Sequence, residues 1–203
     1  MKTLLLIHTS LQGPKSLSSS LASDYVAQWQ ANNPDGHLIS RDLASNPVPH
    51  LTAERFAAFT TAADERNAEQ LAIAAFSDQL IQELHEADEV LLAVPMHNFG
   101  IPSTLKAYFD HVARAGLTFR YTPDGAVGLL TNKRAIVFAT RGGKYEGTPL
   151  DTQTSYMKTF LAFLGIDDTQ FVYAEGTAMG NESLNAGIQN ARQQIRTLEA
   201  VAA

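Results

Sequence analysis

The chain has 203 residues, of which 45% are hydrophobic and 18% charged, with a formal net charge of −6 and no cysteine. This composition is that of an ordinary globular protein, and we expect one domain over residues 1–203. The acidic balance argues against a nucleic-acid partner, which usually requires a basic patch. The absence of cysteine excludes disulfides and thiolate metal sites and fits a cytoplasmic location. No apolar run has the length of a membrane span.

The first predicted strand, residues 4–7, is a continuous apolar run typical of a strand buried on both faces of a parallel sheet. A polar loop follows it, and apolar residues at helical spacing begin at position 21. The start of a helix offers unpaired N–H groups and the positive end of its dipole, and serine hydroxyls add further donors. Ser10, Ser16 and Ser18 therefore predict a site for a phosphate monoester. The alternative is that Ser16 and Ser18 only cap the helix.

Residue types in this loop exclude several well-known phosphate-binding motifs. The dinucleotide-binding fingerprint is absent because no Gly-x-Gly-x-x-Gly follows the first strand. A Walker A loop is excluded because Pro14 occupies the glycine position directly before Lys15-Ser16. A thiol phosphatase would need a loop cysteine, and a phospho-acceptor domain would need carboxylates where His8 and Thr9 stand. The loop is therefore predicted to bind phosphate without reacting with it.

The rest of the chain alternates between helix and strand patterns. Strands are predicted at 37–41, 88–94, 134–139 and 170–174, and helices at about 63–87, 103–115, 152–164 and from Asn181 onward. A short helix carrying Phe56 and Phe59 follows Thr52, and residues 118–130 predict a hairpin-like excursion. This alternation predicts a doubly wound, five-stranded parallel α/β sheet with helices on both faces. The strand order 2-1-3-4-5 is taken by analogy with folds of this kind.

Three unusual loops, residues 10–18, 95–99 and 140–143, each follow the carboxyl end of a predicted strand. In such a sheet these loops lie side by side, at the edge where ligands bind. Met96 and Phe99 offer apolar contact to a flat ring. Each feature alone is better explained by core packing or by a turn than by a ligand. Their coincidence on one edge predicts a ligand with both a phosphate and a flat ring.

Two further features of these loops refine that prediction. Asn98 and nearby backbone N–H groups can bond the polar edge of a ring, and the paired glycines at 142 and 143 let the backbone approach it closely. His97 has no second metal ligand at a suitable spacing, so we expect no metal site.

Motifs along nearly the whole chain carry a resemblance to a known family. They are Ser10, Ser16-x-Ser18, Pro95-Met-His-Asn-Phe99, Leu105-Lys-x-Tyr-Phe-Asp110, Ala113-Arg-Ala-Gly116, Thr118-Phe-Arg-Tyr-Thr122, Arg141-Gly-Gly143 and Phe171-Val-Tyr-Ala-Glu-Gly176. Together they resemble the FMN-dependent NADH-azoreductases, also described as NADH:quinone oxidoreductases, which have a flavodoxin-like fold. The Met-x-Asn-Phe and Arg-Gly-Gly loops are the more specific parts.

The resemblance implies a site for one FMN per subunit. It places the phosphate on Ser10, Ser16, Leu17 and Ser18, and the ring against Met96, His97, Asn98 and Phe99, with Thr140, Arg141, Gly142 and Gly143 at its other polar edge. His97 stands where tyrosine is frequent in the family, which changes bulk and polarity beside the ring. Thr140 stands where serine is frequent and keeps the hydroxyl.

The resemblance also implies an activity and an assembly. NADH would reduce the flavin, whose N5 carries the hydride, and a quinone or azo compound would then take its place in a ping-pong cycle without a catalytic side chain. A homodimer would cover the open side of the cofactor, with Phe59, Phe119 and Tyr121 as candidate walls of the substrate slot. Core packing explains these three aromatic residues equally well.

Three other functions stay open on the sequence. One is a different flavodoxin-like NAD(P)H-dependent FMN reductase, acting on metal ions, nitro compounds or free flavins. Another is a flavodoxin-type carrier of single electrons, which needs no substrate slot. The third is a regulator that binds flavin without turnover. Mixing the protein with NADH and then with menadione would separate them.

Overall fold

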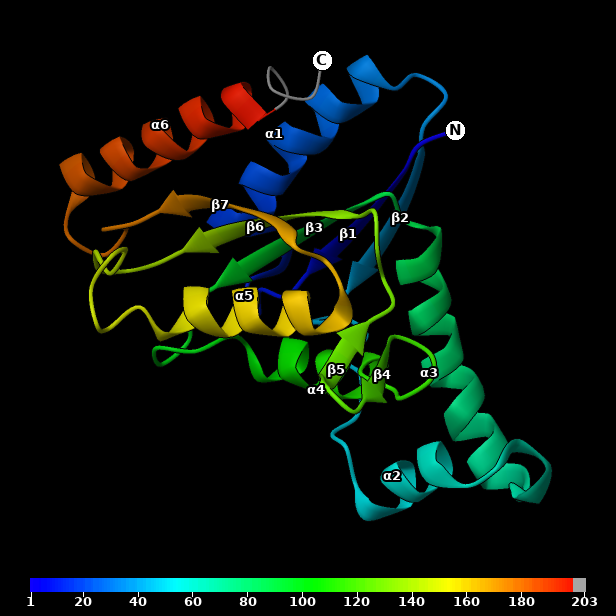
Figure 1. Cartoon of the computed structure of the whole chain (residues 1–203). Helices are drawn as coiled ribbons and strands as arrows, with labels where there is room; N and C mark the ends of the chain where they lie inside the picture. The colour runs from blue at the N-terminus through cyan, green and yellow to red at the C-terminus, as the bar shows by residue number, and fades with distance from the viewer. Residues whose placement is uncertain (199–203) are drawn as a thin grey trace.

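A computed structural model describes residues 1–198 and has a five-stranded parallel sheet at its centre (Figure 1). The strands are β1 (Thr3–His8), β2 (His37–Asp42), β3 (Glu89–Pro95), β6 (Arg134–Thr140) and β7 (Asp168–Ala174). Their order is β2-β1-β3-β6-β7. The predicted order 2-1-3-4-5 is confirmed, since β4 and β5 form a separate sheet. The single domain over residues 1–203 stays a prediction, and residues 199–203 lie outside the described part.

Helices cover both faces of this sheet, as Figure 1 shows. Helices α1 (Leu17–Asn32) and α6 (Asn181–Leu198) pack on one face. Helices α3 (Ala68–Glu86), α4 (Ser103–Val112) and α5 (Thr152–Leu164) pack on the other, and α2 (Ala53–Thr60) packs against α3. Within residues 1–198, no helix combines the length and apolarity needed to cross a bilayer.

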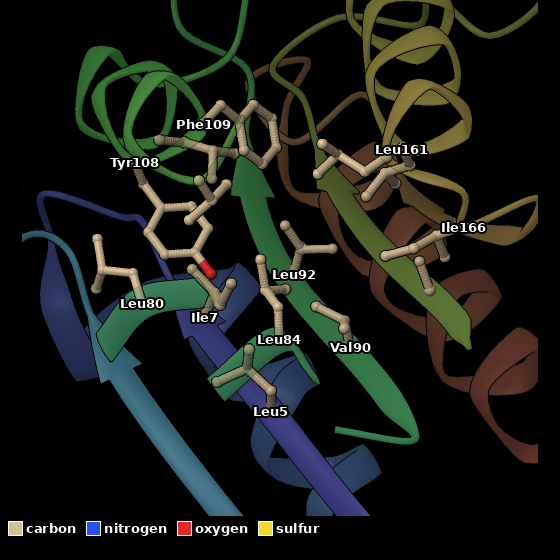
Figure 2. Close-up of a cluster of buried hydrophobic side chains, with 14 of the residues drawn as sticks. Leu5, Ile7, Leu80, Leu84, Val90, Leu92, Tyr108, Phe109, Leu161 and Ile166 are labelled. Atoms are coloured by element: carbon tan, nitrogen blue, oxygen red, sulfur yellow. The ribbon is translucent and has the colours of Figure 1, made fainter. Parts of the chain in front are cut away.

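The sequence of β1 explains why the sheet is buried on both sides. Successive side chains of a strand point to opposite faces. Leu4 and Leu6 belong to the cluster under α1 and α6. Leu5 and Ile7 belong to the other cluster, where Figure 2 shows them among side chains of α3, α4 and β3. Both sets are almost fully buried, so the continuous apolar run is what a two-sided core requires.

Two predicted helix boundaries are wrong. The third helix begins at Ala68 rather than near 63, because Asn67 caps it and exchanges hydrogen bonds with Gln70 in a capping box. Residues 63–65 form a separate 3₁₀ turn, η2 (Ala63–Glu65). The fourth helix ends at Val112 rather than 115, since the Arg114 N–H leaves the helical pattern and bonds the Val112 carbonyl and the Thr118 hydroxyl.

The predicted excursion between 118 and 130 is an antiparallel hairpin of β4 (Phe119–Thr122) and β5 (Gly125–Gly128). Its last residue lies directly against the end of α5. A Cβ atom on Gly128 would lie 2.0 Å from the backbone nitrogen of Gly165, so only glycine fits this crossing. Leu130 donates its N–H to the Leu164 carbonyl at the same crossing.

Candidate functional site

A cavity of about 440 Å³ lies at the carboxyl ends of β1, β3 and β6. Its volume falls within the usual range for small-molecule sites, and it lies at the β1/β3 switch point of the sheet. The lining residues are Ser10, Leu11, Gln12, Ser16, Leu17, Ser18, Pro95, Met96, His97, Thr140, Gly142, Thr177 and Leu184. All three predicted loops therefore contribute to one cavity.

The first loop brings a helix N-terminus to the cavity. It passes through the short 3₁₀ turn η1 (Gly13–Lys15), and Ser16 then caps α1 by accepting the Ser19 N–H at 3.1 Å. Within the described residues, the backbone N–H groups of Leu17 and Ser18 donate to no protein acceptor. Two unpaired donors at the positive end of a helix dipole favour an anion at this position.

Three buried serine hydroxyls surround these N–H groups. Ser10, Ser16 and Ser18 are each at most 5% exposed, yet all three line the cavity. The Ser10 oxygen accepts the Gln12 N–H at 3.3 Å, which leaves its own hydrogen available. Among residues 1–198 no carboxylate lines the cavity, so no negative side chain of this part of the chain opposes an anionic group there. Capping and anion binding are thus compatible, because Ser16 does the first and the free donors permit the second.

The second loop forms a tight turn at the tip of β3. His97 and Gly100 exchange two backbone hydrogen bonds, and Asn98 and Phe99 between them have φ of 49° and 65°. Positive φ is uncommon for Phe and marks a conformation that the surroundings must enforce. Met96 and His97 line the cavity, whereas Phe99 packs edge-on against Tyr145. Neither Asn98 nor Phe99 is part of the cavity lining.

The third loop presents backbone rather than side chains. The carbonyls of Arg141, Gly142 and Gly143 accept hydrogen bonds from the chain after β7. The N–H groups of Gly142 and Gly143 have no acceptor in the part of the chain that the structure describes. Gly142 and Thr140 line the cavity, and Gly143 does not. The loop thus offers the close backbone approach expected from its glycines.

The side chain of Arg141 is directed into the protein, away from the cavity. It is 1% exposed and donates to Gln153, Glu175, Asp151 and Thr154 at 2.8–3.1 Å. Burial raises the pKa of Asp151, but hydrogen bonds from Arg141 and Thr154 outweigh burial and the net pKa is lowered. The Arg141 guanidinium therefore forms ion pairs with both Asp151 and Glu175, and these ion pairs fix the loop that carries Gly142.

The three candidate wall residues do not line this cavity. Phe119 is buried against Phe163 and Tyr121, while Tyr121 itself is 76% exposed on the hairpin. Phe59 lies on α2, which Figure 1 places beside the far end of α3. Its ring meets the His111 ring edge-on at 5.5 Å. Within this chain, Phe119 packs in the interior, whereas Phe59 is half-buried against His111.

The His111 beside Phe59 makes folding stability depend on pH. Its Nδ1–H donates to the Ala107 carbonyl, and its Nε2 lies 3.4 Å from the Arg55 guanidinium. Burial and the charges of Arg55 and Arg114 lower its pKa, although the Ala107 bond and Asp110 act in the opposite direction. Because the unfolded chain takes up this proton at a higher pH, stability falls as pH drops below about 6.5.

We expect the variant His111→Gln to show a weaker dependence of stability on pH than the native chain. The difference in slope should appear below pH 6.5, stay under the single-proton limit of about 1.4 kcal/mol per pH unit, and become negligible above pH 7.5. Urea unfolding of both proteins at pH 7.5, 6.0 and 5.0 measures it. If the unfolding free energies of the two proteins had the same pH dependence, His111 would not be the source of the pH effect, whatever the absolute stability of the variant.

Two lining residues, Thr177 and Leu184, follow β7 and lie outside the three predicted loops. The predicted site residues also omit three residues that lie within or beside those loops and line the cavity, namely Leu11, Gln12 and Pro95. Thr177 is held by bonds from its N–H and hydroxyl to the Arg141 carbonyl. A signal for Thr177 and Leu184 existed, because β7 also ends at this edge of the sheet. Loops that follow the carboxyl ends of parallel strands lie at the ligand edge of the sheet, and the loop after β7 is a fourth loop of this kind.

The fold and the cavity define a flavodoxin-like α/β protein whose first loop brings a helix N-terminus with unpaired N–H groups to the cavity. A family model described as flavodoxin-like fold matches residues 1–198. "FMN-dependent NADH:quinone oxidoreductase" of Cellvibrio japonicus is 52% identical over 182 residues, 90% of this chain and 92% of that one. The protein of the same name from Alteromonas mediterranea is 53% identical over 196 residues, 96% of this chain and 97% of that one. The chain belongs to the flavodoxin-like family of FMN-dependent NADH:quinone oxidoreductases.

A solved structure agrees with this family assignment. The FMN-dependent NADH-azoreductase from Bacillus anthracis, crystallised in complex with FMN, superposes with a TM-score of 0.84 at 27% identity. The match covers 98% of this chain and 99% of that one. The resemblance drawn from the loop motifs is thereby confirmed.

Proposed function

We propose that the cavity binds FMN and that the protein transfers hydride from NADH to quinones and azo compounds. The observation that carries the proposal is the pairing of a helix N-terminus free to bind an anion with a backbone loop free to bond a ring. Family membership supports it, since relatives from two genera bear the name FMN-dependent NADH:quinone oxidoreductase.

The residues present fit this cofactor. Its phosphate would be held by the N–H groups of Leu17 and Ser18 and by the hydroxyls of Ser10, Ser16 and Ser18, which have the donors that the group needs. Its ring would lie against Met96, whose thioether is a soft apolar surface. The free N–H of Gly142 would meet a polar edge of the ring.

Bound FMN supplies two-electron hydride chemistry between NADH and the acceptor. The chain's own residues bind and orient the reacting groups. Gly142 offers a fixed backbone donor toward negative charge on the ring, which costs no reorganisation during the reaction. Among the residues that line the cavity within 1–198, His97 is the only ionisable one. Its imidazole replaces the family's frequent tyrosine and would therefore influence which acceptors fit.

A homodimer is part of this proposal, because one chain leaves the cavity open to solvent. Leu11 on its rim is 72% exposed, and Met179 in the loop after β7 is 58% exposed. Apolar side chains around an open site suit a covering partner. Tyr121, exposed on its hairpin, remains a proposed slot wall that would act on the partner's cavity. Light scattering at micromolar concentration would give twice the 22.0 kDa chain mass.

A cytoplasmic location also belongs to the proposal. The chain has no cysteine, which fits a reducing compartment, and NADH is the donor in its relatives' names.

Rapid mixing under anaerobic conditions tests the proposed activity. The purified protein should be yellow, NADH should bleach it in one step, and menadione should restore the colour. A long-lived intermediate colour would indicate a carrier of single electrons. Retention of the yellow colour with NADH would indicate a flavin-binding regulator. Faster recovery with ferric or nitro compounds than with menadione would favour a different reductase of this fold.

A further inference from the structure

A row of hydrogen-bonded side chains leads from the cavity to an imidazole behind it. Ser18 Oγ lies 3.3 Å from Ser16 Oγ, and Ser16 Oγ lies 2.8 Å from Ser19 Oγ. Ser19 Oγ in turn lies 3.4 Å from Nδ1 of His8, the last residue of β1. Ser16 and Ser18 line the cavity, whereas Ser19 and His8 do not. The imidazole therefore reaches the anion site only through hydroxyl groups.

The number of hydrogens in this row limits what the anion site can donate. Each hydroxyl has one hydrogen and two lone pairs. Ser16 Oγ accepts the Ser19 N–H and donates its own hydrogen to Ser19 Oγ. Ser19 can then give its hydrogen to an unprotonated Nδ1 of His8. In this arrangement the hydrogen of Ser16 points away from the cavity and is lost to a ligand.

Protonation of His8 reverses the direction of the hydrogen bonds along this row of side chains. Nδ1 then carries a hydrogen and donates it to Ser19 Oγ, so the hydrogen of Ser19 turns toward Ser16 Oγ. Ser16 Oγ now accepts two hydrogen bonds, one from the Ser19 N–H and one from its hydroxyl, and its own hydrogen is free for the cavity. One proton taken up at His8 therefore adds both a donor and a positive charge on the side of the anion site.

We propose that His8 is a positioning residue that couples proton uptake to the binding of a phosphate monoester in the cavity. The proposal rests on the proposed function, because it takes FMN as the ligand that carries the phosphate. Ser19 and Ser16 transmit the effect, and His8 itself touches neither ligand nor cavity. Coupling between two binding equilibria is reciprocal. Bound phosphate therefore raises the affinity of His8 for a proton by the same factor by which protonation of His8 raises the affinity for phosphate.

The groups around His8 act on its pKa in opposite directions. Burial lowers its pKa, and the Asp42 carboxylate, its cross-strand neighbour on β2, opposes the decrease. Burial raises the pKa of Asp42, but bonds from Ser45 and Ala44 outweigh burial, so Asp42 is anionic wherever His8 titrates. Ser19 is the group that faces His8 from α1 and is uncharged. The free protein thus holds His8 neutral at pH 7.5, and bound phosphate would shift proton uptake by His8 toward higher pH.

The test compares FMN with riboflavin, which lacks the phosphate, on the native protein and the variant His8→Asn. The variant keeps an amide near the Nδ1 position and cannot titrate. Diluting the flavin-loaded proteins and following the fluorescence of released flavin gives a dissociation constant at each pH from 8.0 to 5.5. The phosphate's own titration near pH 6 cancels in the ratio of variant to native protein. His37→Asn is the matched control, an exposed histidine at the opposite end of β2.

We expect the ratio of FMN dissociation constants, His8→Asn over native, to rise about tenfold from pH 8.0 to pH 5.5. The same ratio for riboflavin, and for His37→Asn with either flavin, should stay constant. An NMR titration of the native protein should show a higher His8 pKa with FMN bound than with riboflavin bound. A constant FMN ratio together with an unchanged His8 pKa would overturn the inference while leaving the proposed function intact. Failure of both flavins to bind at any pH would instead overturn the proposed function.

Discussion

Replacing Arg141 by methionine should destabilise the protein by about 3–5 kcal/mol, the usual cost of leaving buried carboxylates without their cation. Arg141 is fully buried and pairs with Asp151 at 2.9 Å and with Glu175 at 3.1 Å. Methionine fills similar volume, so lost charge and hydrogen bonds rather than a cavity would cause the loss. Urea unfolding monitored by the fluorescence of Trp29 measures the change.

The consequence extends to the cavity, because Arg141 connects its walls. Gln153, which accepts the Nε–H of Arg141, also donates to the carbonyls of Val94 and Pro95 at the end of β3. Glu175 also accepts the N–H groups of Tyr145 and Glu146. Without the guanidinium, the loop holding Gly142 loses its fixed position. We therefore expect weaker FMN binding in any fraction that folds.

Two further variants make this prediction decisive. Arg192→Met removes an exposed ion pair with Asp24 on the surface and should cost less than about 1 kcal/mol. Adding Asp151→Asn and Glu175→Gln to Arg141→Met removes the uncompensated charges and should recover part of the loss. A cost for Arg141→Met as small as that for Arg192→Met would show that the buried pair contributes nothing.

Arg141 also shows where sequence reasoning reached its limit. An arginine before two glycines, in a loop at the ligand edge, is compatible with a ligand contact or with a solvated side chain, whereas the structure buries it. Its partners lie 10 to 34 residues further along the chain, and only the folded structure brings them to one point. Phe59 was ambiguous for a similar reason, since the spacing of an amphipathic helix does not say which surface receives it.

The central strand and the position of the site could be predicted, because each follows from local sequence patterns that hold in the folded protein. The apolar run of β1 identifies a central strand because both of its faces are buried. Parallel strands then bring their following loops to one edge, so Ser16, Met96 and Gly142 meet without any long-range contact being known. The start of α3 was missed although a local signal exists, because Asn67 with Gln70 three residues later is the capping-box pattern that marks a helix start.

The variant Ser18→Asp should lower FMN affinity at least a hundredfold while leaving the fold as stable as before. Ser18 is the second residue of α1, lines the cavity and is 1% exposed. A carboxylate in the first turn interacts favourably with the helix dipole, by about 0.3–1 kcal/mol, and can accept the free N–H groups of this turn. The new side chain would thus take the place of the phosphate and repel it. A hundredfold loss corresponds to about 2.7 kcal/mol.

A large loss of cofactor binding without a loss of stability distinguishes an anion site from a simple helix cap. If the serines of this loop only capped α1, Ser18→Asp would change thermal stability slightly and leave FMN binding alone. If they hold the phosphate, FMN affinity collapses and riboflavin affinity stays within about threefold, because riboflavin presents no charge to the new carboxylate. Ser20→Asp adds the same charge to the same helix at a residue outside the cavity lining, so its effect on FMN should stay below about tenfold. Equal losses for the two variants would mean that the phosphate is bound elsewhere, because only a site at Ser18 makes the position of the charge matter.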